Sequence, residues 1–154
     1  MDKHTFVING ITFRCSKFDV YDGLKISKRL MGYMATAYTK GITKKTVEEM
    51  MKSGEEVEPD KTAILEKIGD LILDISDEDI AMIFDKSLMI TEVQRDNTFT
   101  AVAMPAMGKP SFCHDDIKAL FSDISNVICF LYEVLKYNFF SSLKDIGSKF
   151  KKPA

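Results

Sequence analysis

The longest helical pattern of apolar residues lies near the C-terminal end of the chain, from Ile117 to Phe140. Apolar residues recur there in alternating steps of three and four, which places them along one face of an α-helix. The stripe consists of Ile117, Leu120, Ile124, Val127, Leu131 and Val134, and it is widened by Phe121, Ile128 and Leu135. This pattern predicts one long helix followed by an aromatic cluster, Tyr137-Asn138-Phe139-Phe140.

Two strand–turn–strand patterns predict β-hairpins. In the first, Asn9-Gly10 separates two β-prone runs and supplies the two positive-φ positions of a type I′ turn. Its expected inward residues are Phe6, Ile8, Ile11 and Phe13. The second hairpin is predicted from Leu88–Gln94 and Thr98–Met104, joined by Arg95-Asp96-Asn97. After it, Pro105, Gly108 and Pro110 predict the end of regular structure.

Three further segments have helical spacing. Asp19–Tyr38 carries Val20, Leu24, Ser27, Met31, Met34 and Tyr38 at such positions. Lys61–Leu73 places Ile64, Leu65, Ile68, Leu71 and Ile72 on one face. Ser76, with Asp79 three residues later, resembles a capping box and predicts a short helix with Ile80, Ile83, Phe84 and Ser87 facing inward.

The remaining segments define the expected domain organisation. Residues 40–61 lack periodicity and pass from a lysine-rich to a glutamate-rich part, which predicts a mobile charged insertion. The lysine-rich end is expected to fray after residue 147. We predict a helix-rich α+β fold, a single domain over residues 1–154, with a long C-terminal helix and two β-hairpins.

Nine methionines and no tryptophan distinguish this composition. Methionine is flexible and polarisable, so it fills irregular cores and also serves surfaces that accept variable apolar partners. We interpret Met31, Met34 and Met82 as core residues. An adaptable binding surface is the alternative interpretation.

The charge pattern favours a cytoplasmic protein without nucleic-acid or membrane partners. The net charge of −2 lacks the basic excess of a phosphate-binding domain. The N-terminus has no apolar signal-peptide core, and Asp123, Glu133 and Lys136 make the long helix too polar to span a bilayer. Three scattered cysteines argue against a disulfide framework.

No residue pattern predicts catalysis, a cofactor or a metal site. His114 adjoins Cys113, but zinc requires more ligands and adjacent helical residues point in different directions. The acidic residues between Asp74 and Asp85 do not have EF-hand spacing. No glycine-rich phosphate loop occurs in the sequence. We therefore predict a protein that is not an enzyme.

Aromatic residues near the C-terminal end are the predicted partner-binding site. Phe130 and Tyr137 lie seven residues apart and off the main apolar stripe, and Tyr132 also lies outside it. Large aromatic rings outside a core face indicate an interface. The alternative is a central helix covered on two sides, whose stripe is simply wide. With the aromatic cluster, the predicted site is Phe130, Tyr132, Tyr137, Phe139 and Phe140.

Taken in order, these features resemble those of a known family. They are the Thr5–Phe13 hairpin, the Leu24–Met34 helix, the Leu88–Met104 hairpin and the ending Leu131–Phe140, an apolar helix closed by Asn-Phe. Over nearly its full length the chain is similar to the tail assembly chaperones of long-tailed bacteriophages. The insertion at 40–61 has no counterpart in that pattern.

The resemblance implies a virus-encoded assembly factor in the host cytoplasm. Such a factor coats the long tape measure protein and keeps it soluble while tail tube subunits polymerise around it. The tail tube protein is a further partner that the resemblance allows. Several copies on one partner would add avidity without strong single contacts.

Two other classes of protein remain open at this stage. One is a structural tail component, such as a tube-completion or connector protein, in which the hairpins supply sheet edges. The other is a small regulator encoded by the phage or its host. Composition does not separate these classes.

Overall fold

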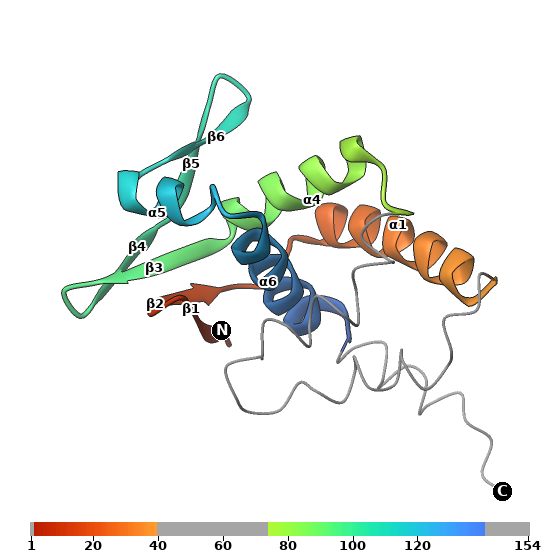
Figure 1. The fold of residues 1–154 in the computed structure, drawn as a ribbon, viewed down its shortest axis with the longest axis horizontal. Helices are drawn as coiled ribbons and strands as arrows, with labels where there is room; N and C mark the ends of the chain where they lie inside the picture. Colours follow the sequence, from red (N-terminus) through yellow and green to blue (C-terminus); the bar gives the residue numbers. More distant parts are fainter. Residues whose placement is uncertain (1, 40–73, 141–154) are drawn as a thin grey trace, which may run out of the picture.

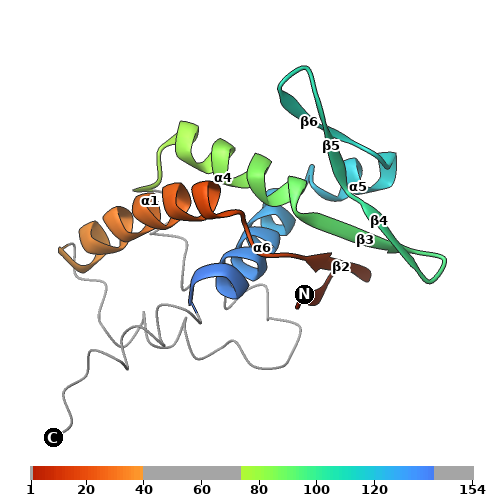
Figure 2. The ribbon, with the colours of Figure 1, turned by 180° about the vertical axis from the view of Figure 1, so that it is seen from behind.

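The computed structural model describes residues 2–39 and 74–140, with the side chains of 34–39 and 140 left out. The predicted insertion at 40–61, the predicted helix at 61–73 and the tail after 147 lie outside this description. The described residues form an α+β fold with antiparallel strands, as the sequence predicts. Helix α6 (Ile124–Leu135) lies between the sheet on one side and helices α4 (Asp77–Met89) and α1 (Val20–Thr39) on the other (Figures 1 and 2).

Both predicted hairpins are present, and they join into one antiparallel four-stranded sheet with the order β1-β2-β3-β4. The strands are β1 (His4–Ile8), β2 (Ile11–Cys15), β3 (Thr91–Arg95) and β4 (Thr98–Ala101). Positive φ angles at Asn9 (50°) and Gly10 (80°) form the first predicted turn. The hairpins meet where Phe13 pairs with Val93, and both of these side chains are fully buried.

The prediction that regular structure ends at Pro105 is wrong. A third hairpin follows, with β5 (Ala103–Ala106) and β6 (Lys109–Phe112), and it projects from the rest of the fold (Figure 1). Met107 and Gly108 form its turn with φ angles of 52° and 80°. Pro105 and Pro110 face each other across the ribbon. Proline is tolerated there because each strand of a two-stranded ribbon has an open edge, where a missing N–H removes no ladder bond.

The capped helix predicted at Ser76 is α4. The Ser76 side chain accepts a hydrogen bond from the backbone N–H of Asp79 at 3.2 Å. The expected inward residues Ile83 and Ser87 are buried. Leu88 and Met89 continue this helix, so strand β3 begins at Thr91 and not at Leu88 as predicted.

The C-terminal helical segment is present, but the prediction of one continuous helix through Ile117 and Ile124 is wrong. A short helix, α5 (Asp115–Leu120), precedes a break, and α6 then runs to Leu135 and continues as the π-helical η1 (Lys136–Phe140). Asp123 caps α6 by accepting a hydrogen bond from the backbone N–H of Ser125 at 2.9 Å. This cap competes with a continuous helix and leaves Ile124, a predicted stripe residue, 71% exposed.

Phenylalanine rings form the centre of the core. The ring centroid of Phe130 in α6 is 4.9 Å from that of Phe121, 5.9 Å from Phe84, 6.0 Å from Phe6 and 6.1 Å from Phe13. Most of these pairs are tilted or edge-on, the geometry that the charge distribution of aromatic rings favours. The cluster therefore connects the sheet, α4 and α6 through one side chain.

Candidate functional site

The predicted aromatic site residues lie mostly inside the molecule. Phe130 is 0% exposed, Tyr132 5% and Phe139 9%. Placing Phe130 and Tyr132 outside the core face was wrong, because α6 is covered on both sides, as in the alternative interpretation. Tyr137 is half-buried, and the side chain of Phe140 lies outside the description. A partner-binding role for these residues stays an untested prediction.

Tyr137 in η1 contacts the N-terminal residues and holds them against the end of the C-terminal helical segment. Its hydroxyl donates a hydrogen bond to the backbone carbonyl of Asp2 at 2.7 Å, and its ring stacks on His4 with centroids 5.2 Å apart. The ammonium group of Lys17 lies 3.9 Å from the ring centroid and donates to the Tyr137 carbonyl. These contacts give the ring a structural role.

Beside it lies a buried charged group, Glu133, which is 2% exposed. Its carboxylate is 2.8 Å from His4 Nε2 and 3.2 Å from Lys136 Nζ. Burial alone would raise the pKa of Glu133, but the hydrogen bond with His4 and the charge of Lys136 hold it below its usual value. Burial also raises the pKa of the neighbouring Cys15 thiol to about 12, which disfavours the nucleophilic thiolate form.

Asn138 holds the link between β2 and α1. Its side chain donates to the carbonyls of Val134 and Ser16 at 3.0 and 3.4 Å and accepts from the backbone N–H of Phe18 at 2.8 Å. Phe18 stacks on Phe139 with centroids 5.7 Å apart. Asn138 and Phe139 form the Asn-Phe pair at the end of the family pattern. Their contacts are therefore made within the fold.

An exposed apolar surface lies instead on α1. Its residues Val20, Leu24 and Met31, here called the α1 stripe, are 82%, 67% and 56% exposed. The opposite face of the helix carries Ile26 and Leu30, which are buried in the core. Periodicity found the α1 stripe, but the interpretation of Met31 as a core residue is wrong. Met82, by contrast, packs against the core, and the side chain of Met34 is outside the description.

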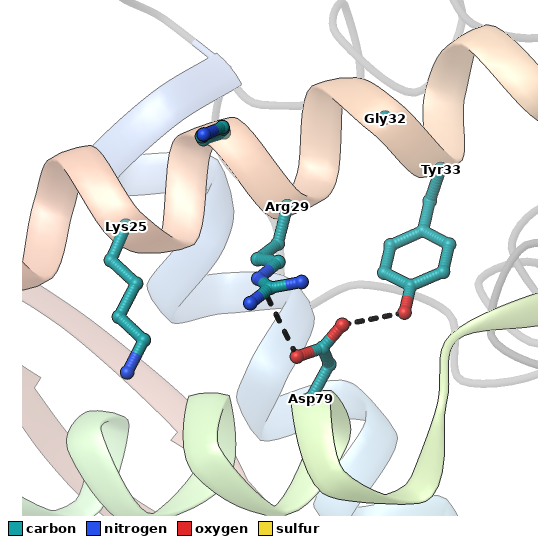
Figure 3. A pocket seen from close by; sticks show the side chains of 6 residues that line it. Lys25, Arg29, Gly32, Tyr33 and Asp79 are labelled. Carbon is teal, nitrogen blue, oxygen red and sulfur yellow. Dashed lines mark hydrogen bonds and ion pairs between the residues drawn. The ribbon is translucent and has the colours of Figure 1, made fainter.

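Cationic residues run beside the α1 stripe, where α1 faces α4. An open pocket of about 480 Å³ lies there, lined by Lys25, Lys28, Arg29, Gly32, Tyr33 and Asp79. Figure 3 shows Lys25, Arg29 and Tyr33 pointing from α1 toward α4. Tyr33 donates a hydrogen bond to the Asp79 carboxylate at 2.6 Å, and Arg29 lies 3.7 Å from the same group. The Tyr33 hydrogen bond is the main cause of the lowered pKa of Asp79.

The described residues offer little for catalysis or metal binding. No group of three or more His, Cys, Asp or Glu side chains among them could hold a metal ion. His114 bonds with the Thr100 hydroxyl at 3.0 Å, and the neighbouring Cys113 is exposed. Within residues 2–39 and 74–140, no helix is long and apolar enough to cross a membrane.

Comparison with known proteins identifies the family. The family model for phage tail assembly chaperone proteins matches residues 9–151. No curated protein and no solved structure matches the chain. The match covers every described helix and strand except β1, which ends at Ile8, before the first matched residue. The chain belongs to the phage tail assembly chaperone family.

Proposed function

We propose that this protein binds the phage tape measure protein in the host cytoplasm and keeps it soluble while the tail tube assembles. Membership of the chaperone family supports the proposal, and the α1 stripe is the structural observation that carries it. Exposed apolar side chains on a folded surface favour contact with apolar segments of a partner. Several copies along one elongated partner would hold it through many weak contacts. The protein acts in this role by binding and not by catalysis.

Co-expression with a tape measure fragment tests the proposal. The soluble fraction of the fragment is measured with and without the full-length chain, and an unrelated small soluble protein at equal expression is the control. We expect the chain to raise the soluble fraction and to co-purify with the fragment. An unchanged soluble fraction without co-purification would contradict the proposal.

A second candidate function is a structural tail component, such as a tube-completion or connector protein. It is favoured by the sheet, in which β1 and β4 are edge strands that could pair with neighbouring subunits. Analysis of purified virions separates the two. Stoichiometric presence of the chain in finished particles supports the structural role, and its absence supports the chaperone.

A further inference from the structure

We propose that the α1 stripe and the lysines beside it form a docking site for an amphipathic helix that carries carboxylates along one border of its apolar face. The inference rests on the proposed function, because it specifies the chemistry of the partner segment that the protein holds.

The α1 stripe has the dimensions of a helix-binding surface. Val20, Leu24 and Met31 extend over twelve residues of one helix, about 16 Å for eleven steps of 1.5 Å. A partner helix engages such a row through anchors spaced three, four and seven residues apart. Met31 adapts its shape to different anchors, which suits a partner with varied sequence.

Positive charge borders the stripe on one side only. With about 100° between successive residues, Lys28 follows directly beside the stripe and Lys25 lies beyond it. Both lysines are exposed, and neither forms an ion pair with any residue that the structure describes. Lys25 points toward α4, and its charge adds, after the Tyr33 hydrogen bond, to the lowered pKa of Asp79. The opposite border consists of Gly23 and Ser27, which are uncharged and partly buried. A helix with carboxylates on the matching border complements this arrangement.

The surface is held in place before any partner arrives. Asp22 pairs with Lys86 of α4 at 3.5 Å, and Tyr33 binds Asp79 near the start of the same helix. Ile26 and Leu30 anchor the inner face in the core. A rigid surface loses little conformational entropy on binding, so weak contacts suffice.

Two synthetic peptides test the charge preference on the full-length chain. They share one leucine stripe and have about 20 residues, long enough to form a helix, and differ in carrying Glu or Lys along one border. Dissociation constants are measured at low and high salt. We expect the Glu peptide to bind about three- to tenfold more tightly at low salt, with a smaller difference at high salt. Equal affinities, or no binding of either peptide, would overturn the inference.

Charge reversal locates the site. Lys25→Glu with Lys28→Glu is expected to abolish the preference for the Glu peptide. The control pair, Lys109→Glu with Lys118→Glu, makes the same change in net charge at exposed positions on β6 and α5 and is expected to keep it. Loss of the preference in both pairs would show a general charge effect and contradict the assignment to α1.

Other occupants of the stripe predict different results. If residues 40–73 of the same chain cover it, Leu24→Ser with Met31→Ser will lower the Tm of the free protein, and if a second copy covers it, the same variant will dissociate an oligomer. Either result overturns the inference. Selective peptide binding combined with failure to solubilise the tape measure fragment would contradict only the proposed function.

Discussion

Burial separates residues that hold this fold from residues that are available to a partner. Phe130 and Leu24 are both large apolar residues at helical spacing, yet one is 0% and the other 67% exposed. Sequence periodicity identifies the helix on which each lies. It does not show how many sides of that helix are covered, since this depends on elements distant in the chain. The predicted aromatic site and the α1 stripe differ for this reason.

Substitution of Phe130 tests its structural role. Phe130→Ala removes the ring that contacts four other phenylalanines and is expected to lower the free energy of unfolding by about 3–5 kcal/mol. Leu24→Ser is the control and is expected to stay within about 0.5 kcal/mol. Denaturant unfolding measures both. A nearly unchanged stability for Phe130→Ala would restore this ring as a candidate for partner binding.

The buried Glu133 predicts acid sensitivity. Its pKa in the folded protein lies below the ordinary value of 4.5, so its ionised form stabilises the fold above that value. This contribution is lost as the pH falls through the folded-state pKa. We expect the Tm of the wild type to fall more steeply than that of Glu133→Gln as the pH drops below the ordinary value of 4.5.

At pH 7 the same variant is expected to be the less stable protein, because it leaves the buried Lys136 without its counter-ion. Equal pH profiles for the two proteins would show that Glu133 does not stabilise the fold in its charged form.

The hydrogen bond between His4 and Glu133 joins two residues that are separated by most of the chain. No local pattern in the sequence indicates that pairing.

At the level of elements, turn and cap chemistry decided which predictions succeeded. Asn9-Gly10 and Asp96-Asn97 occupy positive-φ turns, and both hairpins are present where these residues predict them. The break before α6 was missed because the apolar stripe continues across it, although Asp123 and Ser125 are a capping signal. The third hairpin was missed because two prolines outweighed the turn signal of Met107-Gly108.

Gly10→Ala tests the importance of the first turn. Gly10 has a φ of +80°, where an added Cβ meets no neighbouring atom but the backbone conformation itself is strained for alanine. We expect a loss of about 1–2 kcal/mol in the free energy of unfolding. Gly32→Ala is a useful control, since Gly32 lies within α1 and also has open space around it. Alanine is the better helix former, so this control is expected to be neutral or stabilising.

For the whole molecule, the α+β class was predictable because most elements carry their own periodicity and need one another's apolar faces. Two attachments to η1 were not predictable, because they depend on side chains that folding brings together. Tyr137 holds the N-terminus, and Asn138 holds the link between β2 and α1. The apolar pattern and the composition are shared by chaperones and structural tail components. The family match supplies that class, and the α1 stripe supplies the surface on which we place the proposed activity.

The most direct test of the central claim is the soluble fraction of a tape measure fragment co-expressed with variants of the full-length chain. Leu24→Ser with Met31→Ser replaces two of the three residues of the α1 stripe, while Ile124→Ser removes a similarly exposed apolar residue on α6. We expect the first variant to lose most of the solubilising effect at unchanged Tm, and the second to retain it. Equal solubilisation by the wild type and both variants would contradict the assignment of partner binding to α1.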